Sequence, residues 1–141
     1  MLYDEQQMNV TTLVNILKNA FFNVFDVEED GFNVIVDKYR ILVSFDTENK
    51  RIKLSSIDPV KDYTPNLYLK LLEAVNSSNQ ELVNVNSHLI NHENKIFLRV
   101  DQHVSYSKGL IIEQFVEILR LFDKISVVVY KDYIGPAAEN N

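Results

Sequence analysis

The sequence contains no cysteine and only three glycines in 141 residues. The first absence excludes disulfides, thiolate nucleophiles and cysteine-bound zinc or iron–sulfur centres. The second leaves no glycine-rich loop that could hold phosphate groups, and neither "SSI" nor "SYSKG" lies in a G-x-S-x-G motif. Because the signatures of common catalytic sites are missing, we expect no enzymatic activity and no cofactor.

Positive charge is also scarce, with 14 Lys and Arg against 20 Asp and Glu and a net charge of -6. Binding to a phosphate backbone or an anionic membrane needs a basic surface that displaces counterions. No apolar run approaches the roughly 18 residues of a membrane span, and the start "MLYDEQQMNV" has no basic segment before an apolar one. We expect a cytoplasmic protein that binds neither nucleic acid nor a membrane.

What the sequence does contain is an ordinary globular composition, with 46% hydrophobic and 24% charged residues. A chain of this length fits one domain with its own core. We therefore expect a single domain over residues 1–141, with a disordered tail at about 136–141 after the Gly135-Pro136 pair.

Apolar spacing in the first half predicts one helix followed by a meander of strands. From Gln6 to Phe22 apolar residues recur every three or four positions, as on one face of an amphipathic helix. Alternating β-branched and aromatic residues then predict strands near 23–28, 32–37, 40–46 and 51–57.

The second half is predicted to contain a helix, a hairpin and a long last helix. Thr64 suits the N-cap of the second helix and Pro65 its first position. Its expected buried face is Leu67, Leu71, Leu72 and Val75. Two alternating segments around "NHEN" form an antiparallel hairpin. Helical spacing from Ser107 ends at Gly135-Pro136, although the β-branched "ISVVVY" leaves 125–134 open between helix and strand.

These elements predict an α+β fold, a two-layer sandwich in which helices cover one face of an antiparallel sheet. The expected order is α-β-β-β-β-α-β-β-α, a meander plus a hairpin. The open sheet face would then carry Asn84, Asn86, His88, Phe97, Arg99, Asp101 and His103.

The last predicted helix has more apolar residues than one buried stripe requires. Besides a core line through Phe115 and Phe122, it carries Leu110, Ile112, Val116, Leu119 and Leu121. A helix that buries more than about 100° of its circumference has a further layer or a partner chain above it. We expect this second set to form a homodimer or partner surface. The alternative is a helix wedged between the sheet and the first helix.

The paired asparagines Asn76 and Asn79 lie where the second helix meets the next strand. Asparagine tolerates the left-handed conformation that ends helices, and its amide can bond open carbonyls there or the backbone of the next strand. We interpret the pair as a structural joint and not as a ligand site.

Histidines are the remaining candidate metal ligands. If the hairpin turns near His92, His88 lies opposite residue 99 and His103 opposite residue 84. The three imidazoles then do not converge, so we expect no metal site. An enzyme would need a cleft that gathers His88, Arg99, Asp101 and His103.

Three segments resemble a known family: "ILVSFD" (41–46) as the central strand, "LLEAVNSSN" (71–79) with its two asparagines, and "KIFLRVD" (95–101) as a hairpin strand. With the order of elements, they resemble the YbjN family of proposed bacterial sensory transduction regulators, similar in fold to type III secretion chaperones. Secretion chaperones bind an extended segment of an effector protein. The resemblance implies a dimeric module that binds an unidentified protein or peptide.

The leading hypothesis is a non-enzymatic protein-binding module, a sensory transduction regulator or a chaperone-like protein that acts as a homodimer. The alternative is a small-molecule-binding sensor domain with a pocket between sheet and helices. That pocket would be lined by Phe21, Phe25, Phe45 and Phe115.

Overall fold

The structure is a computed structural model that describes residues 1–139. The chain divides into two compact units. Unit 1 combines Met1–Ser55 with His103–Asp123, and unit 2 combines Ser56–Gln102 with the chain from Lys124. The expectation of one domain over residues 1–141 stays a prediction.

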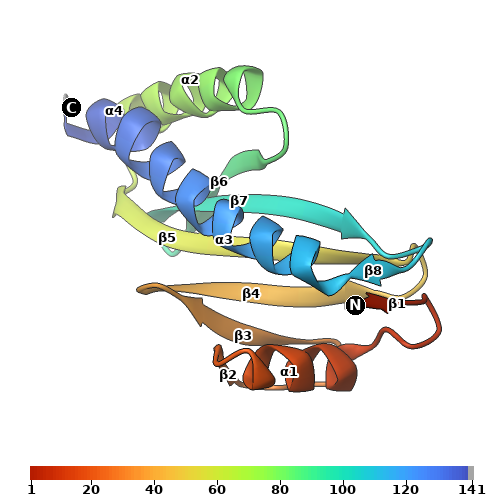
Figure 1. Cartoon of the computed structure of the whole chain (residues 1–141). Coiled ribbons are helices and arrows are strands. Elements are labelled where there is room, and N and C mark those ends of the chain that lie inside the picture. Colours follow the sequence, from red (N-terminus) through yellow and green to blue (C-terminus); the bar gives the residue numbers. More distant parts are fainter. Residues whose placement is uncertain (140–141) are drawn as a thin grey trace. The chain divides into compact units, whose positions relative to one another are not determined.

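The elements give an α+β fold in the predicted order, with short additions (Figure 1). They are β1 (Leu2–Tyr3), α1 (Val10–Asn19), β2 (Asn23–Phe25), β3 (Gly31–Val36), β4 (Tyr39–Asp46), β5 (Arg51–Asp62), α2 (Pro65–Glu81), β6 (Asn86–His92), β7 (Lys95–Ser105), β8 (Leu110–Ile111), α3 (Ile112–Val128), the π-helix η1 (Val129–Ile134) and α4 (Gly135–Glu139). One six-stranded antiparallel sheet has the order β2-β3-β4-β5-β7-β6, and β1 pairs with β8 in a two-stranded sheet. The edges of the larger sheet are therefore β2 and β6.

In unit 1, α1 packs against β2 and β3 (Figure 1). The helix begins at Val10, four residues later than predicted, because the side chain of Asn9 accepts a hydrogen bond from the Thr12 N–H at 2.8 Å and caps it. The buried residues of α1 are Leu13, Val14 and Leu17. They share a core with alternate residues of the strands, Phe32, Val34, Val36, Ile41, Val43, Ile52 and Leu54.

The C-terminus of α1 has two hydrogen bonds typical of a Schellman motif. The Phe22 N–H donates to the Leu17 carbonyl at 2.9 Å, and the Phe21 N–H donates to the Lys18 carbonyl at 3.0 Å. Phe21 takes the left-handed position of this motif, with φ of 67°, and its side chain is 97% exposed. An aromatic residue thus occupies the position where glycine is usual.

Local backbone geometry shifts two predicted boundaries in unit 1. β2 ends at Phe25, before the predicted 28, because Asp26 adopts a left-handed φ of 51°. The segment after Ser107 is not yet helical, because Gly109 has φ of 92° and β8 pairs with β1. α3 therefore begins at Ile112.

In unit 2, α2 begins as predicted. The Thr64 hydroxyl accepts a hydrogen bond from the Leu67 N–H at 3.2 Å, and Pro65 occupies the first turn. Leu67, Leu71 and Val75 are buried. Leu72 is 39% exposed, so its predicted burial is wrong, because it lies about 100° around the helix from Leu71.

The C-terminal part of unit 2 is helical, which settles the open choice for 125–134. α3 continues to Val128, and η1 carries the chain to Ile134. The predicted helix end at Gly135-Pro136 is wrong, because Pro136 lies in the first turn of α4, where no N–H is required.

The predicted disorder of the tail is wrong for 136–139, which belong to α4. Ala138 is buried, and its carbonyl accepts a hydrogen bond from Lys61 Nζ at 2.7 Å. Residues 140 and 141 lie outside the described part of the chain.

Candidate functional site

The β6–β7 hairpin of unit 2 gathers most of the predicted open sheet face. His88 pairs with Arg99, as predicted, and Asn86 pairs with Asp101. The turn residues Glu93 and Asn94 have φ of 52° and 62°, as a two-residue type I′ turn requires. Because side chains alternate along each strand, these four residues project from the same face of the hairpin.

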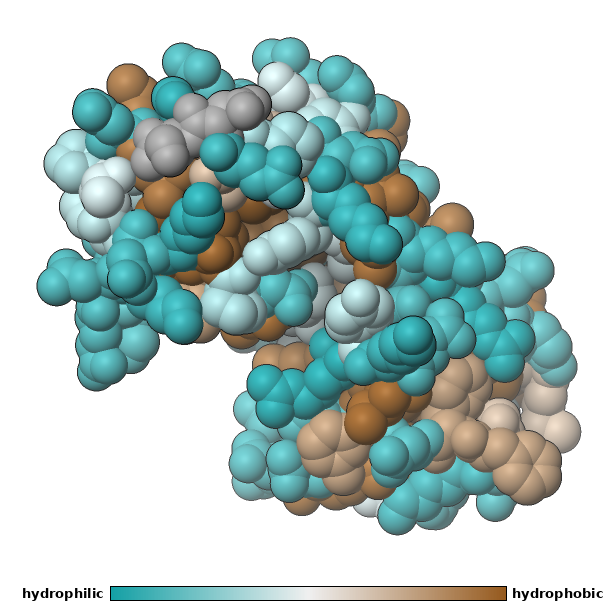
Figure 2. All heavy atoms as spheres, turned by 90° about the vertical axis from the view of Figure 1, so that its left-hand side faces the viewer, coloured by the Kyte–Doolittle hydropathy of each residue, from teal (hydrophilic) through white to brown (hydrophobic). Residues whose placement is uncertain are grey.

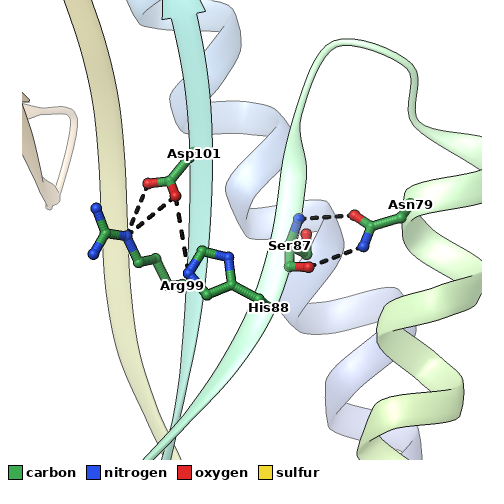
Figure 3. Close-up of polar contacts among 5 residues, drawn as sticks. All are labelled: Asn79, Ser87, His88, Arg99 and Asp101. Carbon is green, nitrogen blue, oxygen red and sulfur yellow. Dashed lines mark hydrogen bonds and ion pairs between the residues drawn. The ribbon is translucent and has the colours of Figure 1, made fainter. Parts of the chain in front are cut away.

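Asp101 is the centre of a polar cluster on this face (Figure 3). Arg99 Nε lies 3.0 Å from one carboxylate oxygen of Asp101 and 3.2 Å from the other. His88 Nε2 lies 3.9 Å from the same carboxylate. Asp101 is buried, whereas His88 is exposed. The carboxylate of Asp101 thus has a cationic partner in Arg99 and an imidazole nearby.

Ile90 and Phe97 form the next pair along the same face, and both are half-buried. The face is therefore amphipathic, with an apolar pair beside a polar cluster. Phe97 was predicted on this face and Ile90 was not. Ile90 lies two residues after His88, so the alternation of side chains along β6 would have indicated it.

Other predicted members of the face lie apart from this cluster. Asn84 is exposed in the loop before β6. His92, which was expected in the turn, pairs with Lys95 beside it. His103 is exposed on the part of β7 that belongs to unit 1. Within residues 1–139, no group of three or more His, Asp or Glu side chains could hold a metal ion.

The outer edge of β6 is partly occupied by a side chain of α2 (Figure 3). The Ser87 N–H donates to Asn79 Oδ1 at 2.7 Å, and Asn79 Nδ2 donates to the Ser87 carbonyl at 2.9 Å. The side-chain amide of Asn79 thus bonds the backbone of the next strand, one of the two roles predicted for it. Asn76 is exposed on α2, which continues past both asparagines to Glu81.

The contact with Asn79 fixes the direction of the other backbone groups of β6. In an antiparallel pair the backbone N–H and C=O of one residue point to the same side, and this side alternates along the strand. Since both groups of Ser87 point away from β7, those of Leu89 and Asn91 do so as well. β6 is an edge strand, and within residues 1–139 no hydrogen bond reaches these outward groups. This open edge of β6 was not predicted from the sequence.

The sequence matches no protein-family model and no curated protein. The structure does match the crystal structure of YbjN, a proposed transcription regulator from E. coli, with a TM-score of 0.71 and 20% identity over 86% of this chain and 88% of that chain. The chain has a YbjN-like fold. An uncharacterized protein from Methanothermobacter thermautotrophicus matches with a TM-score of 0.60 and 12% identity, over 86% of this chain and 94% of that chain. These similarities confirm the predicted fold.

The predicted partner surface on the last helix of this YbjN-like fold is only partly exposed. Leu110 and Leu119 are 5% and 0% exposed, so their assignment to an open surface is wrong. Leu119 lies four residues after Phe115 and therefore on the same buried line of the helix. Ile112 and Val116 are half-buried, and Leu121 is 53% exposed.

No helix within residues 1–139 is long and apolar enough to cross a membrane.

The predicted aromatic pocket is also wrong in its lining. Phe21 is almost fully exposed and Phe115 is fully buried, so the four phenylalanines do not enclose one cavity. A hollow of about 600 Å³ in unit 1 includes only Phe45 of that set. The hollow is lined by Asn9, Val10, Glu28, Glu29, Asp30, Phe45 and Thr47. It is strongly acidic, unlike the apolar pockets that commonly bind small molecules.

In the view of Figure 2, hydrophilic side chains cover most of the surface and apolar side chains are exposed between them. The open edge of β6 is distinguished by its hydrogen-bonding capacity. This capacity is directional, because it repeats every second residue along the strand.

Proposed function

We propose that this chain is a non-enzymatic protein-binding module that takes an extended peptide segment of a partner protein along the open edge of β6. The observation that carries the proposal is the outward direction of the backbone groups of Leu89 and Asn91. An added strand supplies backbone donors and acceptors with the same two-residue spacing, which is the basis of β-augmentation. Side chains of the hairpin beside the edge would select among peptide sequences.

The nature of the partner follows from charge and from the fold. YbjN is described as a proposed transcription regulator. This chain has a net charge of -6, which opposes direct contact with a phosphate backbone. A regulatory role would therefore act through another protein, in agreement with the extended segment that secretion chaperones bind.

The test is selection of peptides from a random library on the immobilised full chain. Asn91→Pro removes the outward N–H at the edge while leaving the bonds to β7 in place, since proline is tolerated on edge strands. Asn91→Ala keeps that N–H and serves as the matched control. We expect selected peptides to bind the Ala variant as they bind wild type, and to lose at least tenfold in affinity for the Pro variant, roughly the loss of one to two backbone bonds.

Amide hydrogen exchange locates the residues that the bound peptide contacts. Bound peptide should slow exchange at Leu89 and Asn91, because their N–H groups enter hydrogen bonds. Failure to select any peptide would overturn the proposal, as would a Pro variant that is folded by circular dichroism and binds with unchanged affinity.

We also propose that the module acts as a homodimer, which the resemblance implies. Leu121 is the most exposed residue of the predicted dimer surface. Light scattering at tens of micromolar should give twice the mass of one chain, and Leu121→Lys should reduce it. A strict monomer for wild type would refute this part.

A further inference from the structure

The last turn of α2 closes one end of the β6 edge. The carboxamide of Asn79 is chemically a peptide group, and it accepts from the Ser87 N–H while donating to the Ser87 carbonyl. An added antiparallel strand would make the same two bonds with the N–H and the C=O of the residue opposite Ser87, which belong to two successive peptide groups. The side chain therefore occupies the place of a neighbouring strand over one residue.

A second contact holds the same turn. The hydroxyl of Tyr133 in η1 donates to the carboxylate of Glu81, the last residue of α2, and this hydrogen bond raises the pKa of Tyr133. The loop that follows Glu81 contains Val83, which is 92% exposed. Two polar contacts thus join the end of α2 to β6 and η1, and Val85 of the connecting loop is buried.

The closed arrangement leaves one polar group unsatisfied. Ser87 is 4% exposed, and its hydroxyl has no hydrogen-bond partner within residues 1–139. A buried hydroxyl without a partner is destabilising. Asn79 therefore holds Ser87 through its backbone and not through its side chain.

We infer that Asn79 is an autoinhibitory latch that restricts an added strand to Leu89 and Asn91, and that its release extends the binding edge to Ser87. The inference rests on the proposed function, since it concerns how the same edge is regulated. Release adds one more outward residue with two backbone hydrogen bonds. At the usual net contribution of such bonds, peptide affinity should rise about tenfold.

The experiment compares Asn79→Ala with Asn76→Ala, a matched control on the same helix whose side chain is exposed. The probe is a synthetic peptide with the sequence recovered from the library selected on wild type, measured by calorimetry on the full chain. We expect about tenfold tighter binding to the Asn79→Ala variant and unchanged binding to the control. Peptide addition should also slow amide exchange at Ser87 in the Asn79 variant alone.

Two further variants keep the inference falsifiable if Asn79→Ala unfolds. Asn79→Asp keeps the acceptor for the Ser87 N–H but cannot donate to its carbonyl, so it should give an intermediate gain. Tyr133→Phe removes the second contact and should give a smaller gain. Equal or weaker binding by all folded variants would overturn the latch while leaving peptide binding intact. If wild type selects no peptide, the proposed function is refuted and the latch with it.

Discussion

Replacing Phe21 by glycine should stabilise the protein, although it removes an aromatic side chain. Phe21 has φ of 67° at the C-terminal end of α1, a left-handed conformation that costs an L-residue roughly 1–2 kcal/mol. Its side chain is 97% exposed, so its removal sacrifices almost no buried area. The Schellman hydrogen bonds of this helix end involve backbone atoms only and persist in the variant.

The expected gain is smaller than the relief of strain. Glycine raises the conformational entropy of the unfolded chain, which costs about 0.4–1 kcal/mol. The net increase in the free energy of unfolding is then about 0.5–1 kcal/mol. With a urea m-value of roughly 1–3 kcal/mol/M, the unfolding midpoint should rise by about 0.2–1 M.

The assay is urea unfolding followed by far-ultraviolet circular dichroism, because the chain has no tryptophan to report on folding. Phe21→Ala is the matched control, since it removes the ring but keeps the Cβ that makes the conformation unfavourable. Phe21→Asn should lie between Ala and Gly, because asparagine tolerates the left-handed region. A midpoint for Gly that is no higher than that for Ala would refute the reasoning.

Two further substitutions follow from the same structure. Gly31→Ala should lower the free energy of unfolding by about 1–3 kcal/mol in the same assay. The added Cβ would lie 2.4 Å from the Val43 carbonyl oxygen, a backbone atom with little freedom to move. An unchanged free energy of unfolding would show that β3 and β4 separate easily. Asp58→Asn should raise the free energy of unfolding at neutral pH. Burial raises the pKa of Asp58, so the folded state is destabilised relative to the unfolded state once pH rises above the usual carboxyl pKa and the group ionises. The gain should disappear below the usual carboxyl pKa, where both states carry the proton, and a gain that is the same at every pH would contradict the assigned cause.

Local signals in the sequence predicted the elements whose boundaries depend on local chemistry. Thr64 and Pro65 predicted the start of α2, and the turn near His92 predicted the register of His88 with Arg99, because both depend on a few adjacent residues. The order of elements and the α+β class followed from periodicity.

Features that depend on distant pairing could not be predicted in this way. β8 forms because Leu2 pairs with Ile111, and no local pattern indicates such a partner. Burial of Leu119 depends on which side of the helix the rest of the chain covers. Asn79 was identified as a joint from its position, but its bond to Ser87 requires the turn of the chain between them. The open edge follows from the strand order, which sequence alone left unspecified.

The π-helix gives the C-terminus of unit 2 some tolerance of chain length. In η1 the Gly135 N–H bonds the Tyr130 carbonyl, five residues back instead of four, so the segment holds one residue more than an α-helix of the same span. Deleting a single residue from 129–134 would therefore restore α-helical bonding over the same span, with Ala138 still buried and its carbonyl still beside Lys61. A deletion from the α-helical residues of α3 has no extra residue to remove, and it would rotate the chain that follows by about 100°. Loss of one residue is therefore better tolerated in 129–134 than in α3.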